Sequence, residues 1–138
     1  MGMTNKNVLQ IICGVLLFLS FFSGWYYYGG FTTIKPIEFI SHPDSKFIFK
    51  LFLAVPVLAI AHIYYGFIKK YNPLLHKIST VVSVILMISM KIHISGMHDS
   101  NDTVSTGFYM AGCSVIVSLA SFFIVKKEIQ SKGIDSNN

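Results

Sequence analysis

The chain has 138 residues and a net charge of +5; hydrophobic residues make up 53% of it and charged residues only 12%. This balance leaves too little polar surface for a soluble globular domain. The positive charge comes entirely from lysine, because the sequence contains no arginine. Arginine is the residue best suited to bidentate recognition of phosphate, so the composition argues against nucleic-acid binding.

Four apolar runs take up most of the chain, at residues 8–24, 51–68, 78–94 and 108–125. An apolar helix of about 20 residues crosses a hydrocarbon core of about 30 Å, so each run is close to the length of one crossing. We therefore predict an all-α fold, a polytopic four-helix transmembrane bundle in a single domain. The predicted helices lie at about residues 6–28, 45–70, 75–95 and 105–127. A flexible cytoplasmic tail is predicted at residues 128–138.

An aromatic stretch, Trp-Tyr-Tyr-Tyr at residues 25–28, should end the first helix at the outer membrane interface, where tryptophan and tyrosine collect. Two glycines at 29–30 then break the helix. We expect a short ordered outer loop to follow, in which Pro36 opens a small helix, since proline is favoured at the first helical position. Isoleucines recur at every third position from 34 to 40 and would form the apolar face of this segment.

The loop charges predict an orientation. Lysines gather in the segments that would share one side of the membrane, namely Lys6, Lys69, Lys70, Lys77, Lys126, Lys127 and Lys132. The other two loops hold the carboxylates Glu38, Asp44, Asp99 and Asp102. Because lysine is enriched in short cytoplasmic loops, both termini are predicted to be cytoplasmic. Three lysines at residues 35–50 reduce the contrast without reversing it.

His62 is the one ionisable side chain within the second apolar run, and it defines a candidate intramembrane polar site. Counted from the cytoplasmic helix ends, it is level with Ser83 and Ser118. A proton relay or a haem or metal ligand is one reading, and a neutral histidine bonded to a serine is the other. We favour the second, because His76 is expected in the cytoplasmic loop and His93 near the opposite face. We therefore assign no catalytic residue, cofactor or metal.

Small residues recur in the fourth run at steps of four and three, which places them on one helical face. They are Gly107, Ala111, Ser114, Ser118 and Ser121. Such a face allows membrane helices to approach closely, so we predict a helix-packing seam in preference to a pore lining.

A charge cluster is predicted at the outer face, formed by Lys91, His93, His98 and Asp99. These include metal-ligand types, but their spacing matches no metal motif, so we expect a snorkelling lysine with solvated loop charges. Cys13 and Cys113 should lie in opposite leaflets, too far apart for a disulfide, and both are interpreted as small packing residues.

The preferred hypothesis is a small non-enzymatic integral membrane subunit that assembles with itself or with a cytoplasmic partner in a bacterial membrane complex, such as a defence system. A small oligomeric channel or pore-forming effector is an alternative, as is an immunity-type protein that blocks a toxin within the membrane. The asparagine, lysine and isoleucine content suggests an AT-rich bacterial gene and hence the bacterial cytoplasmic (inner) membrane. No family is recognised from these motifs. Small multidrug transporters, for example, depend on a glutamate in their first helix, and residues 8–24 contain no acid.

Overall fold

The computed structural model of the chain describes residues 4–43, 46–96 and 103–135, with side chains as far as residue 124. In chain order, its elements are α1 (Asn5–Phe22), β1 (Tyr26–Tyr28), β2 (Thr32–Ile34), α2 (Pro36–Ser41), the 3-10 helix η1 (Phe47–Leu53), α3 (Ala54–Phe67), α4 (Pro73–Ser95), β3 (Thr103–Val104) and α5 (Thr106–Asp135). Four helical segments are long and apolar enough to cross a membrane: Asn5–Phe22, Phe47–Phe67, Pro73–Ser95 and Thr106–Ile124. The prediction of a mainly helical fold with four long apolar helices is confirmed, and three short strands are added to it.

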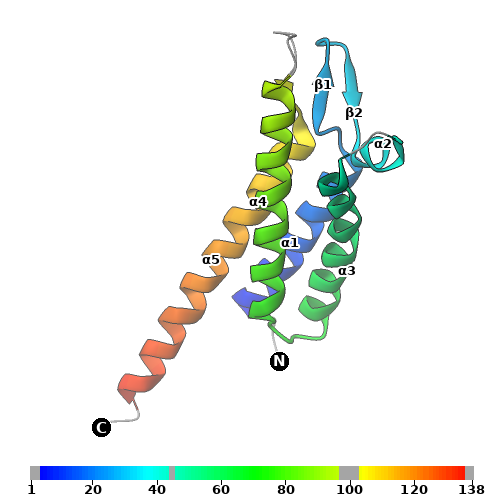
Figure 1. The fold of residues 1–138 in the computed structure, drawn as a ribbon. Coiled ribbons are helices and arrows are strands. Elements are labelled where there is room, and N and C mark those ends of the chain that lie inside the picture. Colours follow the sequence, from blue (N-terminus) through cyan, green and yellow to red (C-terminus); the bar gives the residue numbers. More distant parts are fainter. Residues whose placement is uncertain (1–3, 44–45, 97–102, 136–138) are drawn as a thin grey trace.

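The long helices form one elongated bundle (Figure 1), in which α1 packs on both α3 and α5, and α4 packs on α5. The N-terminus lies beside the connection between α3 and α4, and we call this the turn end of the bundle. The strands β1 and β2 and the helix α2 lie at the opposite end, which we call the hairpin end. The last helix, α5, extends past the other helices at the turn end.

The surface of this bundle is more apolar than that of a soluble domain, and many polar side chains are buried. Large apolar side chains face outwards on every long helix, among them Phe22, Val57, Ile60, Ile92 and Ile116. The buried polar side chains are Asn7, Gln10, Ser20, His62, His76, Ser79, Ser83, Ser105, Ser114, Ser118 and Ser121. Lipid-facing surface must be apolar, and polar groups inside must find partners within the bundle, so this distribution fits a hydrocarbon surrounding.

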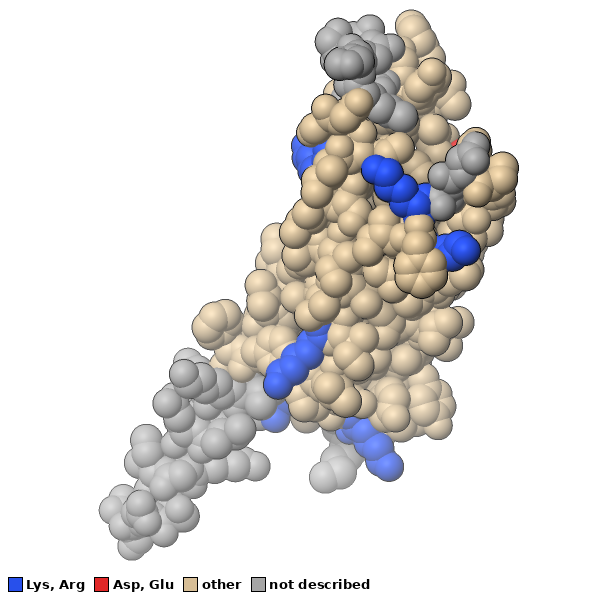
Figure 2. All heavy atoms as spheres, in the orientation of Figure 1, with Lys and Arg blue, Asp and Glu red and all other residues tan. Residues whose placement is uncertain are grey.

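Charged side chains lie towards the helix ends. In the view of Figure 2, lysines form one group near the turn end and a second group in the hairpin half of the bundle, below the tip of the hairpin. Lys6 is at the start of α1, and Lys77 and Lys91 lie in the first and last parts of α4. A long lysine side chain near a helix end can bring its ammonium group to the membrane surface while its stem stays in apolar surroundings.

The prediction that the first helix reaches residue 28 is wrong. Helix α1 ends at Phe22, and residues 26–28 form β1, which pairs antiparallel with β2 and with β3 in the order β2-β1-β3. Consecutive tyrosines favour a strand, and Gly29 and Gly30 supply the positive φ angles of the turn, 57° and 76°. Pairing with two strands removes Tyr26 from the expected interfacial belt and buries it to 1% exposure.

The outer loop is ordered where it is described, but its apolar face differs from the predicted one. Pro36 is the first residue of α2, as expected. The buried residues of this helix are Pro36 and Phe39, whereas Ile37 is 52% exposed. The second predicted helix starts as η1 and continues as α3, in which Pro56 lacks the N–H that would bond the preceding turn.

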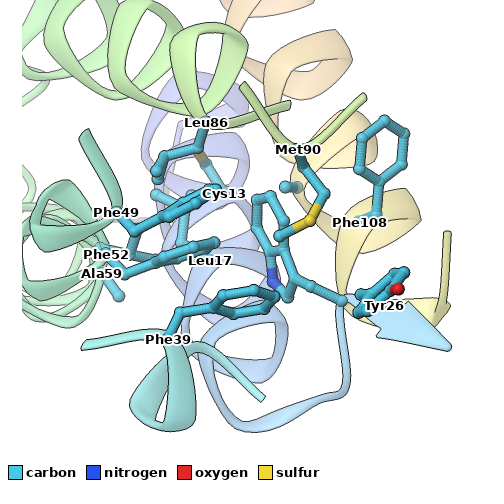
Figure 3. Close-up of a cluster of buried hydrophobic side chains, with 13 residues drawn as sticks. Cys13, Leu17, Tyr26, Phe39, Phe49, Phe52, Ala59, Leu86, Met90 and Phe108 are labelled. Carbon is cyan, nitrogen blue, oxygen red and sulfur yellow. The ribbon is translucent and has the colours of Figure 1, made fainter. Parts of the chain in front are cut away.

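An aromatic core fills the hairpin end. Phe39 from α2 stacks on Phe52 from η1 with ring centroids 6.1 Å apart, and Phe49 stacks on the same ring at 6.2 Å (Figure 3). Trp25 is fully buried and meets Phe52 edge-on at 4.7 Å. Its indole Nε1 donates to the Ser20 carbonyl oxygen at 2.9 Å, so the expected interfacial role of this tryptophan is also wrong.

Helix α5 continues without a break through residues 128–135, so this part of the predicted flexible tail is helical.

Candidate functional site

Three helices bring a thiol and two imidazoles together near the turn end. Cys13 comes from α1, His62 from α3 and His76 from α4, and each of the three residues is 0% exposed. Cys13 Sγ lies 3.8 Å from His62 Nε2, and the two histidine rings have centroids 4.5 Å apart. One ligand-type atom from each residue lies within 4.8 Å of the others. In the part of the chain that the structure describes, this is the one such group that could share a metal ion.

Serine hydroxyls connect this cluster. Ser79 Oγ lies 2.8 Å from His62 Nε2 and donates its proton to the Leu75 carbonyl oxygen at 2.9 Å. A hydroxyl holds one proton, so Ser79 accepts from His62, and the proton of this neutral imidazole then sits on Nε2. The Ser118 hydroxyl lies 3.2 Å from Cys13 Sγ and 3.1 Å from His76 Nδ1, so it links the thiol to the second ring.

Small residues allow the helices to approach closely enough to form the cluster. A Cβ atom added at Gly14 would lie 2.7 Å from the Ala59 carbonyl oxygen and 2.9 Å from His62 Cβ. One at Gly66 would lie 3.1 Å from the Asn7 carbonyl oxygen. A side chain at either glycine would push α1 and α3 apart, so these glycines allow Cys13 to lie against His62.

The ring of His76 is held from two further sides. Tyr71 stacks on it with centroids 5.3 Å apart, and Phe122 meets it edge-on at 6.2 Å. The Tyr71 hydroxyl in turn lies 3.0 Å from Ser121 Oγ. His76 Nε2 and His62 Nδ1 are buried and find no hydrogen-bond partner among the described residues.

The predicted polar site is only partly the site that the helices assemble. His62 and Ser118 both contact Cys13, whereas the serine bonded to His62 is Ser79. Ser83 is buried one helical turn beyond Ser79.

The expectation that His76 lies in the cytoplasmic loop is wrong, because it lies in the first turn of α4 and its ring packs against that of His62. The signal for this was in the sequence. Asn72 caps α4 by accepting from the amides of Leu74 and Leu75, and Pro73 is its first residue, an order of residues typical of a helix start. The interpretation of Cys13 as a packing residue was also incomplete, since nothing in the sequence indicated which side chains it would face.

The five small residues of the fourth apolar run, Gly107, Ala111, Ser114, Ser118 and Ser121, all lie on the buried face of α5. Ser20 on α1 donates to the Gly107 carbonyl oxygen at 2.9 Å, and a Cβ added at Gly107 would collide with the indole ring of Trp25.

The predicted outer-face charge cluster is divided. Lys91 is exposed, with its ammonium 5.8 Å from the centre of the Phe108 ring. His93 lies against aromatic rings, the nearest being Phe49 at 5.5 Å. The other two members, His98 and Asp99, lie outside the described residues.

Comparison of the chain with protein-family models, curated proteins and solved structures found no match.

Proposed function

We propose that the chain is a small non-enzymatic integral membrane subunit of a bacterial membrane complex, which assembles with itself or with a cytoplasmic partner. The observation that carries this proposal is the distribution of polar and apolar side chains: eleven of the described polar residues are buried, and large apolar side chains are exposed along all four candidate spans. A helical bundle of this kind is suited to lipid, because in water it would expose a large apolar surface.

The orientation we propose places the turn end in the cytoplasm and the hairpin end outside. The turn end holds Lys6, Lys69, Lys70 and Lys77, and lysine in short loops favours the cytoplasmic side. Helix α5 extends beyond the bundle at this same end, so its last part lies where a cytoplasmic partner would meet the chain.

A packing role for the serine face of α5 is favoured over a channel lining. Ser114 and Ser121 donate to carbonyl oxygens in the preceding turn at 2.7 Å each, and Ser118 contacts Cys13 and His76 inside a single chain. All three serines are at most 2% exposed within a single chain, so they are not available to line a path between copies. The cluster of Cys13, His62 and His76 is likewise closed to solvent, which argues against turnover of a soluble substrate there.

The proposal is tested by extraction and assembly experiments on the full-length chain. In the first experiment, membranes from expressing cells are washed with alkaline carbonate. In the second, intact cells are treated with a short amine-reactive cross-linker. Retention in the carbonate-washed membrane and a cross-linked species larger than the monomer are expected. A matched chain ending after residue 127 keeps the described side-chain contacts and should lose cross-links to a cytoplasmic partner, but not links between copies. Release by carbonate would contradict membrane insertion, and a monomer alone under every condition would contradict assembly.

A further inference from the structure

We propose that Cys13, His62 and His76 form an intramembrane binding site for a monovalent soft metal ion, Cu(I). Each residue comes from a different helix, each is fully buried, and one ligand-type atom from each lies within 4.8 Å of the others. Thiolate and imidazole together are typical ligands of copper and zinc.

The spacing of these atoms is near that of a coordinated ion. Three N and S ligands at about 2.0–2.3 Å around one ion in a plane lie about 3.5–3.8 Å from one another. Cys13 Sγ and His62 Nε2 are already 3.8 Å apart. The widest separation in the group, at most 4.8 Å, needs to close by about 1 Å, a change within the reach of side-chain rotation.

The unpaired ring nitrogens support a ligand role. A buried histidine kept only for hydrogen bonding normally has a partner at both ring nitrogens, since an unpaired buried polar atom is costly. Here His62 Nδ1 and His76 Nε2 have none among the described residues. His62 can therefore move its proton from Nε2 to Nδ1 at the cost of its bond to Ser79 alone, and this leaves a lone pair on Nε2 for a metal ion.

Charge favours Cu(I) over Zn(II). A thiolate and two neutral imidazoles cancel the charge of Cu(I), whereas Zn(II) would leave one positive charge among apolar surroundings. The one carboxylate among the described side chains is Glu38, on α2 at the hairpin end, so no described anion is placed to neutralise the excess. The preference for Cu(I) over Zn(II) rests on the membrane position proposed above, whereas the choice of the three ligand residues does not.

The binding step changes no oxidation state. Cu(I) forms bonds to Cys13 Sγ, to His62 Nε2 and to one ring nitrogen of His76. The thiol proton leaves to solvent, so one proton is released for each ion bound.

The test is an anaerobic titration of the detergent-purified, full-length chain with Cu(I) in competition with bicinchoninate, a coloured Cu(I) chelator. One ion per chain is expected to transfer from the chelator to the protein. Cys13→Ser and His76→Gln should each weaken binding by at least about tenfold, since even the loss of a residue that only orients a metal ligand costs that much. Cys113→Ser is the matched control, because this exposed free cysteine lies outside the cluster, and it should bind like wild type.

If a variant fails to fold, X-ray absorption of the copper-loaded wild type still tests the site. One sulfur and two nitrogen atoms are expected as neighbours of the copper ion. No transfer of Cu(I) to wild type would overturn the site. Unchanged binding by folded Cys13→Ser and His76→Gln would do the same and show an adventitious ion only. Displacement of the bound Cu(I) to bicinchoninate by an equal concentration of Zn(II) would overturn the choice of ion. All of these readouts are made in detergent on isolated chains, so they are independent of whether the proposed assembly exists.

Discussion

The hairpin end and the turn end of the bundle are stabilised by different interactions. At the hairpin end Trp25, Phe39, Phe49 and Phe52 pack ring against ring, and few polar atoms are enclosed. At the turn end the enclosed groups are a thiol, two imidazoles and serine hydroxyls. Aromatic packing supplies contact area without requiring a hydrogen-bond partner for every atom. In a buried polar cluster, each unpaired group costs free energy, so the helices must hold one relative position in which the groups meet. The first end is suited to stability and the second to a specific site.

The largest expected effect is at the hairpin end. Trp25→Ala removes a fully buried ring that contacts Phe52 and Phe108, and it should lower the free energy of unfolding by about 3–5 kcal/mol. Denaturation in mixed micelles of a mild detergent and SDS measures this. The control is Phe31→Ala, whose side chain is 95% exposed and should change stability by less than about 0.5 kcal/mol. Equal losses for both variants would contradict the aromatic core.

The next effect is at the junction of α5 with the polar cluster. Ser118→Leu forces a larger apolar group between Cys13 and His76 and should cost about 1–3 kcal/mol of stability through overpacking. Ile116→Leu, at a position that is 67% exposed, keeps a large apolar residue on the outer face and should behave like wild type. Size-exclusion profiles and unfolding curves of the two variants check this, and indistinguishable behaviour would argue against close packing at Ser118.

The smallest expected effect is at His62. His62→Gln keeps a donor for Ser79 and should be tolerated. His62→Leu removes the donor to the Ser79 oxygen, which still donates to Leu75, and should cost about 1–2 kcal/mol or less, because polar contacts between membrane helices are often weak. Ion flux into liposomes is measured alongside stability for both variants and for wild type. Wild-type proton flux that is lost in a stable, assembled Gln variant would replace the non-conducting account with a proton relay, since glutamine does not titrate near neutral pH.

The two ends also differ in how far the sequence predicts them. Apolar runs of membrane-spanning length predict the four long helices directly, because the requirement is one of length and composition. The strand at residues 26–28 was missed because consecutive tyrosines fit both an interfacial belt and a strand, although Gly29 and Gly30 between strand-forming residues were a hairpin signal. At the turn end, Pro73 as a helix start would have placed His76 inside the bundle. The direction in which the Cys13 side chain points depends on the rotation of α1 about its own axis against α3. Packing at Gly14 and Ala59 sets this rotation, and no local sequence pattern reveals it.

The sidedness of the two ends gives the most direct test of the account. In a Cys113→Ala background, in which the remaining Cys13 is fully buried, single cysteines are introduced by Phe31→Cys at the hairpin end and by Lys70→Cys at the turn end. Intact cells are treated with a membrane-impermeant maleimide before and after permeabilisation. The account predicts labelling of position 31 in intact cells and of position 70 only after permeabilisation. Labelling of position 70 from outside intact cells, with position 31 protected, would contradict it.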